Sequence, residues 1–205
     1  MVFPTSGRGG GGGGASAVGE DGETAPSGGG LVHILTAGTG TGTTTGSTFA
    51  NFFSASYDSY YIVIRELSQG NDAIEMRMQF NQTSDGTVEA GAAYEVSLVG
   101  GPTTGGSYNN GQVGSTSMKI CPNLGNAAGE LYVATLMVSG MQNSAVYGTL
   151  HGTIGWIHGS DYLVAGQIAA YYSGNATTSF SGFTIFTDEG NFAGGSITVF
   201  GIVES

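Results

Sequence analysis

Residues 74–80 read IEMRMQF, and this stretch decides the fold class. Apolar and polar side chains alternate through all of it: Ile74, Met76, Met78 and Phe80 are apolar, and Glu75, Arg77 and Gln79 are polar. Successive side chains of an extended chain point to opposite faces, so this period of two buries one face and leaves the other in water. The stretch therefore predicts a half-buried β-strand.

The same pattern recurs on both sides of this stretch, and we find no segment with convincing helical periodicity. Further strands are expected at residues 31–36, 60–67, 93–99, 117–121, 131–138, 146–157, 162–172, 182–187 and 196–203. Loops rich in Gly, Asn, Ser and Asp separate them, among them residues 37–47 and 100–111. This spacing predicts an all-β domain, an antiparallel β-sandwich or jelly roll. Residues 183–203 are expected to close the chain as a hairpin whose last strand lies deep in the sheet.

A change of composition near Leu31 divides the chain into two parts. Residues 6–17 read SGRGGGGGGASA, and Gly loses more conformational freedom on ordering than any other residue. We therefore expect an extended Gly-rich N-terminal arm (residues 1–30) and a β domain (residues 31–205). A Gly-rich arm can thread a narrow crevice between other subunits, where its backbone groups find partners. The residues expected to dock it are Phe3, Pro4, Arg8, Gly9, Gly10, Gly11 and Gly12.

The charge balance narrows the range of partners. Four Lys and Arg against 15 Asp and Glu give a net charge of −11. Nucleic-acid binding draws on clustered basic residues, so we expect no nucleic acid as a partner, and anionic membrane surfaces are disfavoured as well. No secretory signal and no apolar run long enough for a membrane helix are evident, so we expect synthesis without export.

Weak charge also leaves the strand edges without protection. An unpaired edge templates aggregation unless it is charged, bulged or covered, and the chain has a single Lys. One cysteine, Cys121, permits no internal disulfide framework. We therefore expect an oligomer whose inner surfaces are apolar.

Catalytic signatures are absent from the sequence. It contains no G-x-S-x-G, no H-E-x-x-H and no G-K-[ST] motif. His151 and His158 could share a strand end, but strand or loop histidines are the simpler interpretation, and Cys121 is expected to be a small buried residue. The acidic stretches at residues 19–23 and 187–191 lack the spacing of a calcium loop. We expect no enzyme activity, no cofactor and no metal.

Aromatic and polar residues adjoin one another in three expected loops. Tyr and Trp offer large contact areas at small entropic cost, which suits recognition of carbohydrate or protein. The candidates for surface recognition are Tyr108, Asn109, Asn110, Trp156, His158, Tyr171 and Tyr172. Packing of the same rings inside the sandwich or at a subunit interface stays open as the alternative.

Two stretches resemble a loose group of bacteriophage virion proteins. Residues 47–64, STFANFFSASYDSYYIVI, resemble a pattern in which a Phe-rich segment precedes Tyr-Asp-x-Tyr and a strand. Residues 191–203, NFAGGSITVFGIV, are similar to the usual ending of that group, with Phe200 where Tyr is commoner. The group comprises small tail or head fibres and capsid decoration proteins. The resemblance implies a trimeric jelly-roll body, a Gly-rich docking N-terminus and no catalytic residues.

These observations lead to one expectation and two alternatives. We expect a non-enzymatic structural protein of the phage particle surface, made in the host cytoplasm, which is docked on capsid or tail subunits through its arm. Its homotrimeric body would serve as a fibre or decoration and could contact a host surface glycan. The first alternative is a carbohydrate-binding module that recognises a bacterial surface polysaccharide. The second is a polysaccharide depolymerase, although no pair of acids in the sequence is singled out for that role.

Overall fold

The computed structural model describes residues 30–38, 46–82, 88–143, 145–174 and 178–203, and all regular structure in them is β. The strands are β1 (Gly30–Gly38), β2 (Gly46–Phe49), β3 (Ser59–Gln69), β4 (Ile74–Gln82), β5 (Tyr94–Pro102), β6 (Tyr108–Ser115), β7 (Met118–Leu124), β8 (Tyr132–Ser139), β9 (Thr149–His158), β10 (Tyr162–Tyr172), β11 (Phe180–Thr187) and β12 (Phe192–Val203). None of these residues belongs to a helix of the length and apolarity that crossing a membrane requires.

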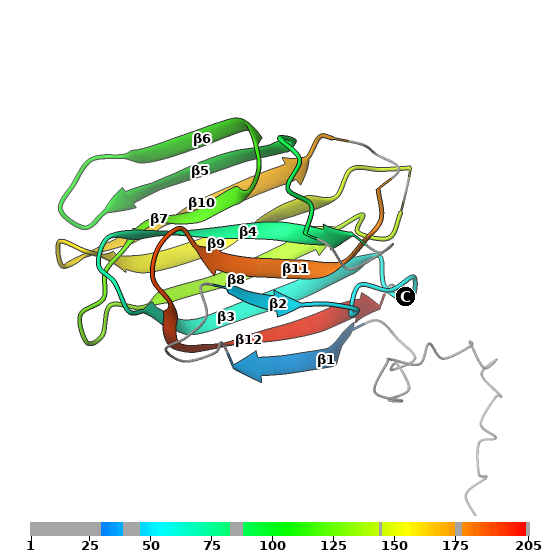
Figure 1. The fold of residues 1–205 in the computed structure, drawn as a ribbon, viewed down its shortest axis with the longest axis horizontal. Helices are drawn as coiled ribbons and strands as arrows, with labels where there is room; N and C mark the ends of the chain where they lie inside the picture. The colour runs from blue at the N-terminus through cyan, green and yellow to red at the C-terminus, as the bar shows by residue number, and fades with distance from the viewer. Residues whose placement is uncertain (1–29, 39–45, 83–87, 144, 175–177, 204–205) are drawn as a thin grey trace, which may run out of the picture.

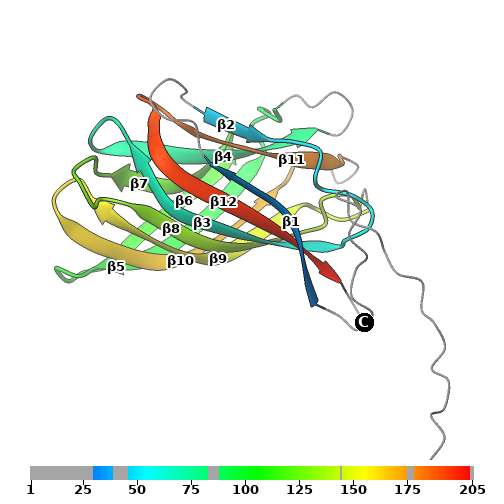
Figure 2. The same cartoon turned by 90° about the horizontal axis from the view of Figure 1, so that it is seen from below.

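The twelve strands form two antiparallel layers. The large sheet has the order β1-β12-β3-β8-β9-β10-β5-β6, with β1 and β6 at its edges, and the small sheet has the order β7-β4-β11-β2 (Figure 1). In the described chain, strand pairing between the two sheets is limited to one residue pair, Leu124 of β7 with His158 of β9. The large sheet curls around the small one (Figure 2). The predicted antiparallel, sandwich-like all-β fold is confirmed.

One hydrophobic core fills the space between the sheets. Phe183 on β11 is fully buried, and its ring centroid lies 5.3 Å from that of Phe49 and 5.4 Å from that of Phe52. The largest fully buried side chains come from both sheets: Trp156, Tyr60, Tyr94, Tyr132, Phe80, Phe180, Phe183 and Phe192. Each buried aromatic side chain removes a large apolar area from water, so the rings carry much of the stabilisation of this fold.

The predicted terminal hairpin is wrong. β11 pairs with β4 and β2 in the small sheet, whereas β12 pairs with β3 and β1 in the large one. The side chains of Phe183 and Ile197 are both completely buried, which is possible because the two strands face each other across the core. The turn between them therefore crosses from one layer to the other. The prediction that the last strand lies inside its sheet is correct, since β12 has a partner on each side.

Two strands were not expected from the sequence. β2 falls at the end of the predicted loop 37–47, and β6 includes residues 108–111 of the predicted loop 100–111. Gly and Asn disfavour strands intrinsically, but Tyr108 and Asn110 pair with Gly100 and Leu98 of β5. Pairing along a long neighbouring strand here overrides local preference.

Candidate functional site

The side of the large sheet that points away from the small sheet is the most distinctive surface, and we call it the outer face. Strand pairing aligns its residues in two neighbouring rows that run across all eight strands. The first row is His33, Phe200, Tyr61, Met137, His151, Ala169, Ser97 and Gly111. The second row is Thr36, Thr198, Val63, Thr135, Thr153, Gln167, Val99 and Asn109. Neither row contains an Asp, Glu, Lys or Arg.

Exposed apolar side chains gather on this face. Of the eight large hydrophobic residues that are exposed in the described chain, six lie on the outer face or line its hollows: Leu31, Val99, Val113, Val133, Tyr147 and Leu163. Val113 on the edge strand β6 is 84% exposed. Val113 and Tyr147 line one hollow together and Val133 and Leu163 line another, and grouped exposed apolar side chains are commonly found at interaction sites. The outer face is therefore a candidate binding surface.

Three shallow hollows mark the outer face. The largest, of about 590 Å³, lies at the start of β9, and the other two have volumes of about 400 Å³ and 470 Å³. They share lining residues: Ser97, His151 and Ala169 line the first two, and Thr153 lines the second and third. The hollows thus adjoin one another along the face.

The largest hollow contains a pair of tyrosines. The rings of Tyr147 and Tyr171 have centroids 5.9 Å apart at an interplanar angle of 59°. A hydrogen bond from the Tyr171 hydroxyl to Glu95 raises the pKa of Tyr171. His151 supplies an exposed imidazole at the same hollow. Rings and polar groups converge here as they do in many ligand sites.

All seven predicted recognition residues lie on strands. The expected placement in loops is therefore wrong for Tyr108, Asn109, Asn110 and His158, whereas Trp156, Tyr171 and Tyr172 fall within the predicted strands 146–157 and 162–172. Trp156 and Tyr172 are only 1% and 6% exposed, respectively, and they face the core, because inward positions alternate with outward ones along β9 and β10. Tyr172 packs on Tyr94, and burial together with the nearby Glu89 raises its pKa to about 12. These two residues form no part of an exposed surface.

The structure brings several of the other predicted residues together. The rings of Tyr108 and Trp156 meet edge to face at 5.8 Å, and the Asn110 amide donates to the Tyr108 hydroxyl at 3.3 Å. His158 stacks on Tyr162 at 4.4 Å, and its Nδ1 accepts a hydrogen bond from the backbone of Ser160. Asn109 is exposed in the second row, and Tyr171 lines the largest hollow. The predicted arm residues Phe3, Pro4, Arg8, Gly9, Gly10, Gly11 and Gly12 lie outside the described residues.

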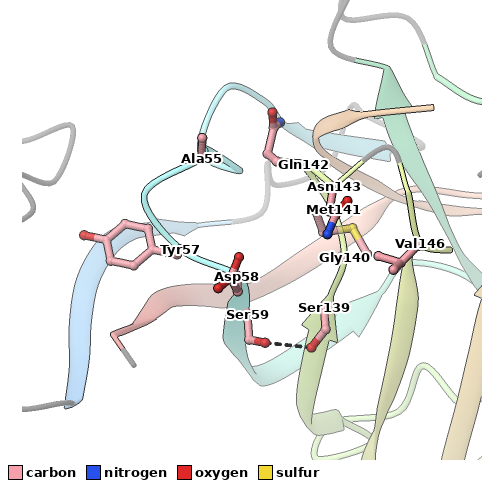
Figure 3. A pocket seen from close by; sticks show the side chains of 10 residues that line it. All are labelled: Ala55, Tyr57, Asp58, Ser59, Ser139, Gly140, Met141, Gln142, Asn143 and Val146. Carbon is pink, nitrogen blue, oxygen red and sulfur yellow. Dashed lines mark hydrogen bonds between the residues drawn. The ribbon is translucent and has the colours of Figure 1, made fainter. Parts of the chain in front are cut away.

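A polar pocket of about 580 Å³ lies where β3 begins and β8 ends (Figure 3). The Ser59 and Ser139 hydroxyls hydrogen-bond across its floor at 2.8 Å, and Asp58, Gln142 and Asn143 lie around them. Asp58 is the only acid among the lining residues, and they include no His or Cys. This lining provides no acid–base pair.

The basic residues of the described chain are largely neutralised. Glu75 forms ion pairs with Arg77 and Lys119 on the small sheet. Burial acts to raise the pKa of Glu75, but the hydrogen bonds from Lys119 and Arg77 outweigh it and hold that pKa below its usual value. Arg65 is the remaining described base. The described surface therefore offers no basic patch to a phosphate backbone.

The candidate catalytic groups do not come together. His151 and His158 lie at opposite ends of β9, and His33 lies on the edge strand β1. Cys121 is completely buried, and burial raises the pKa of its thiol, which opposes the thiolate form. Among the described residues, no group of three or more His, Cys, Asp or Glu side chains is placed to hold a metal ion.

Comparison with known proteins gives no match: no family model fits the sequence, and neither a curated protein nor a solved structure is significantly similar to the chain.

Proposed function

We propose that this chain is a non-enzymatic structural protein of a phage particle. Its arm, residues 1–30, attaches to capsid or tail subunits. Its β body, residues 31–205, projects from the particle as a homotrimer and serves as a fibre or decoration that contacts the host surface.

One observation carries this proposal: the start of β1 and a group of exposed acidic side chains lie at opposite ends of the body. β1 begins at Gly30, which pairs with Val203, so the arm joins the body at the end where the polar pocket of Figure 3 also lies. The turns at the other end carry four exposed acids: Asp72, Asp161, Asp188 and Glu189. The body can therefore be held at one end while its acidic end points away from the attachment point.

Deletion of residues 1–30 tests the proposal. The truncated body should retain its circular-dichroism spectrum and its oligomeric mass but should be missing from purified particles. Asp161→Asn is the matched control, because it keeps the arm, and Asn tolerates the positive φ of 59° at this turn position. It should be incorporated like the parent chain. Normal incorporation of the truncated body would refute the role of the arm.

A carbohydrate-binding module is the second candidate, favoured by the Tyr147 and Tyr171 pair. Tyrosine faces can pack against the apolar side of a sugar ring while Glu95 and His151 bond its hydroxyl groups. A glycan array probed with the full chain and with Tyr147→Ala checks this candidate. Binding of the parent chain to a glycan that Tyr147→Ala no longer binds would support this candidate. If the parent chain binds no glycan on the array, the candidate is refuted.

A further inference from the structure

We infer that the outer face of the large sheet is covered by other copies of this same chain. The inference deepens the proposed function, because it names the surface through which the copies contact one another. It rests on the proposed function only for the number of copies, which is three. The lack of charge in both rows, the size of the face and the shapes of its two halves support it independently.

Charge favours a second copy over an unrelated partner. The chain carries a net charge of −11, so two copies repel each other wherever acidic surfaces meet. The two rows of the outer face bear no formal charge, and the two charged residues that line its hollows, Arg65 and Glu95, have opposite signs, so copies can touch here with little of this repulsion. A basic partner would instead be drawn to the acidic turns at the end of the body.

The whole face contributes to the assembly when each copy contacts two neighbours. Adjacent strands lie about 4.8 Å apart, so the eight strands span roughly 38 Å. With a length of about 26 Å along the strands, the face measures roughly 1,000 Å², and each of its two halves roughly 500 Å². One half alone is smaller than the roughly 800 Å² that each partner gives to a standard stable interface, so a copy is held by both of its contacts together.

The two halves of the face complement each other in shape. On the half formed by β1, β12, β3 and β8, the first row carries the bulky side chains Phe200, Tyr61 and Met137. On the half formed by β9, β10, β5 and β6, the first row continues from His151 to the small residues Ala169, Ser97 and Gly111, and the two hollows of about 590 and 400 Å³ lie there. Bulky side chains of one copy can thus fill the hollows of the next.

Such a contact joins different halves of successive copies. It produces a closed ring if the rotation from one copy to the next adds up to a full turn. The curl of the large sheet, visible in Figure 2, turns the two halves in different directions, as a closed ring requires. A two-fold dimer would instead place identical halves together, small against small or bulky against bulky. The shape therefore favours a cyclic oligomer.

Sedimentation velocity of the full chain tests the inference. The parent chain should sediment with the mass of several copies. Ala169→Glu places an acid in the hollows of every copy, and we expect it to sediment as a single chain, because burial of an unpaired charge opposes association. Gln167→Glu is nearly isosteric and should weaken association at least tenfold without disturbing the fold.

Ser160→Glu is the matched control, since it adds the same charge at an exposed turn far from the rows. It should keep the parent mass. A parent chain that stays single at all concentrations would overturn the inference, and so would parent-like masses for both Ala169→Glu and Gln167→Glu. Incorporation into particles is measured separately, with the arm deletion. The role of the arm and the association through the outer face can therefore be refuted independently of each other.

Discussion

Phe183→Ala should lower the free energy of unfolding by about 3–5 kcal/mol, because it leaves a cavity at the centre of the core. The Phe183 side chain is completely buried and packs against Phe49, Phe52 and Phe53, with ring centroids 5.3, 5.4 and 6.4 Å away. The partner rings come from β2 and from the segment that follows it. Because the core extends across both layers, these rings cannot collapse far enough to refill the space.

Urea unfolding followed by circular dichroism measures this loss at a fixed protein concentration. Phe183→Leu is the control, since it keeps most of the apolar volume and should cost clearly less. Equal losses for the two variants would mean that the ring cluster is not packed as described. A loss below about 1 kcal/mol for Phe183→Ala would contradict the two-layer core itself.

Gly152→Ala should destabilise the body by about 3 kcal/mol or more, since a methyl group there meets backbone that cannot move aside. Gly152 lies on β9 opposite Leu136 of β8. A Cβ atom at this position would overlap the Thr135 carbonyl oxygen and lie 2.9 Å from Leu136 Cα. Relief would require separation of two central strands of the large sheet.

Gly155→Ala, on the same strand, is the matched control. Its added Cβ would lie 3.6 Å from Val133 Cγ2 and 3.8 Å from the Val164 carbonyl oxygen, which are ordinary contacts. Thermal melting of both variants at one concentration should show a large drop for Gly152→Ala and a change within about 1 kcal/mol for Gly155→Ala. Similar melting of Gly152→Ala and the parent chain would contradict the close approach of β8 and β9.

Much of the fold could be predicted, because apolar and polar residues alternate in the sequence of a strand that is buried on one face only. Residues 74–80 predicted β4, and residues 162–172 predicted β10 with the same bounds. This alternation does not predict which strands pair with one another. The segments around residues 188–191 therefore suggested a hairpin, although β11 and β12 belong to different layers.

The candidate site was harder to predict for a related reason. Trp156 lies next to polar residues in the sequence, yet alternation along β9 turns it inward. Tyr147 and Glu95 were not expected at any site, and His151 was considered only together with His158, because these three residues meet only once β9, β10 and β5 are aligned. Each strand by itself shows only one or two uncharged outward residues, and these residues become two continuous rows only through the pairing.

Electron cryo-microscopy of the intact particle that carries this chain tests the central claim most directly. The claim is that the arm attaches the protein to the particle and that the outer faces of the bodies contact one another. The proposal predicts density for bodies grouped in threes, with their outer faces turned toward one another and their Gly30 ends directed at the particle. Isolated single bodies with uncovered outer faces, or bodies whose acidic turns face the particle, would contradict it.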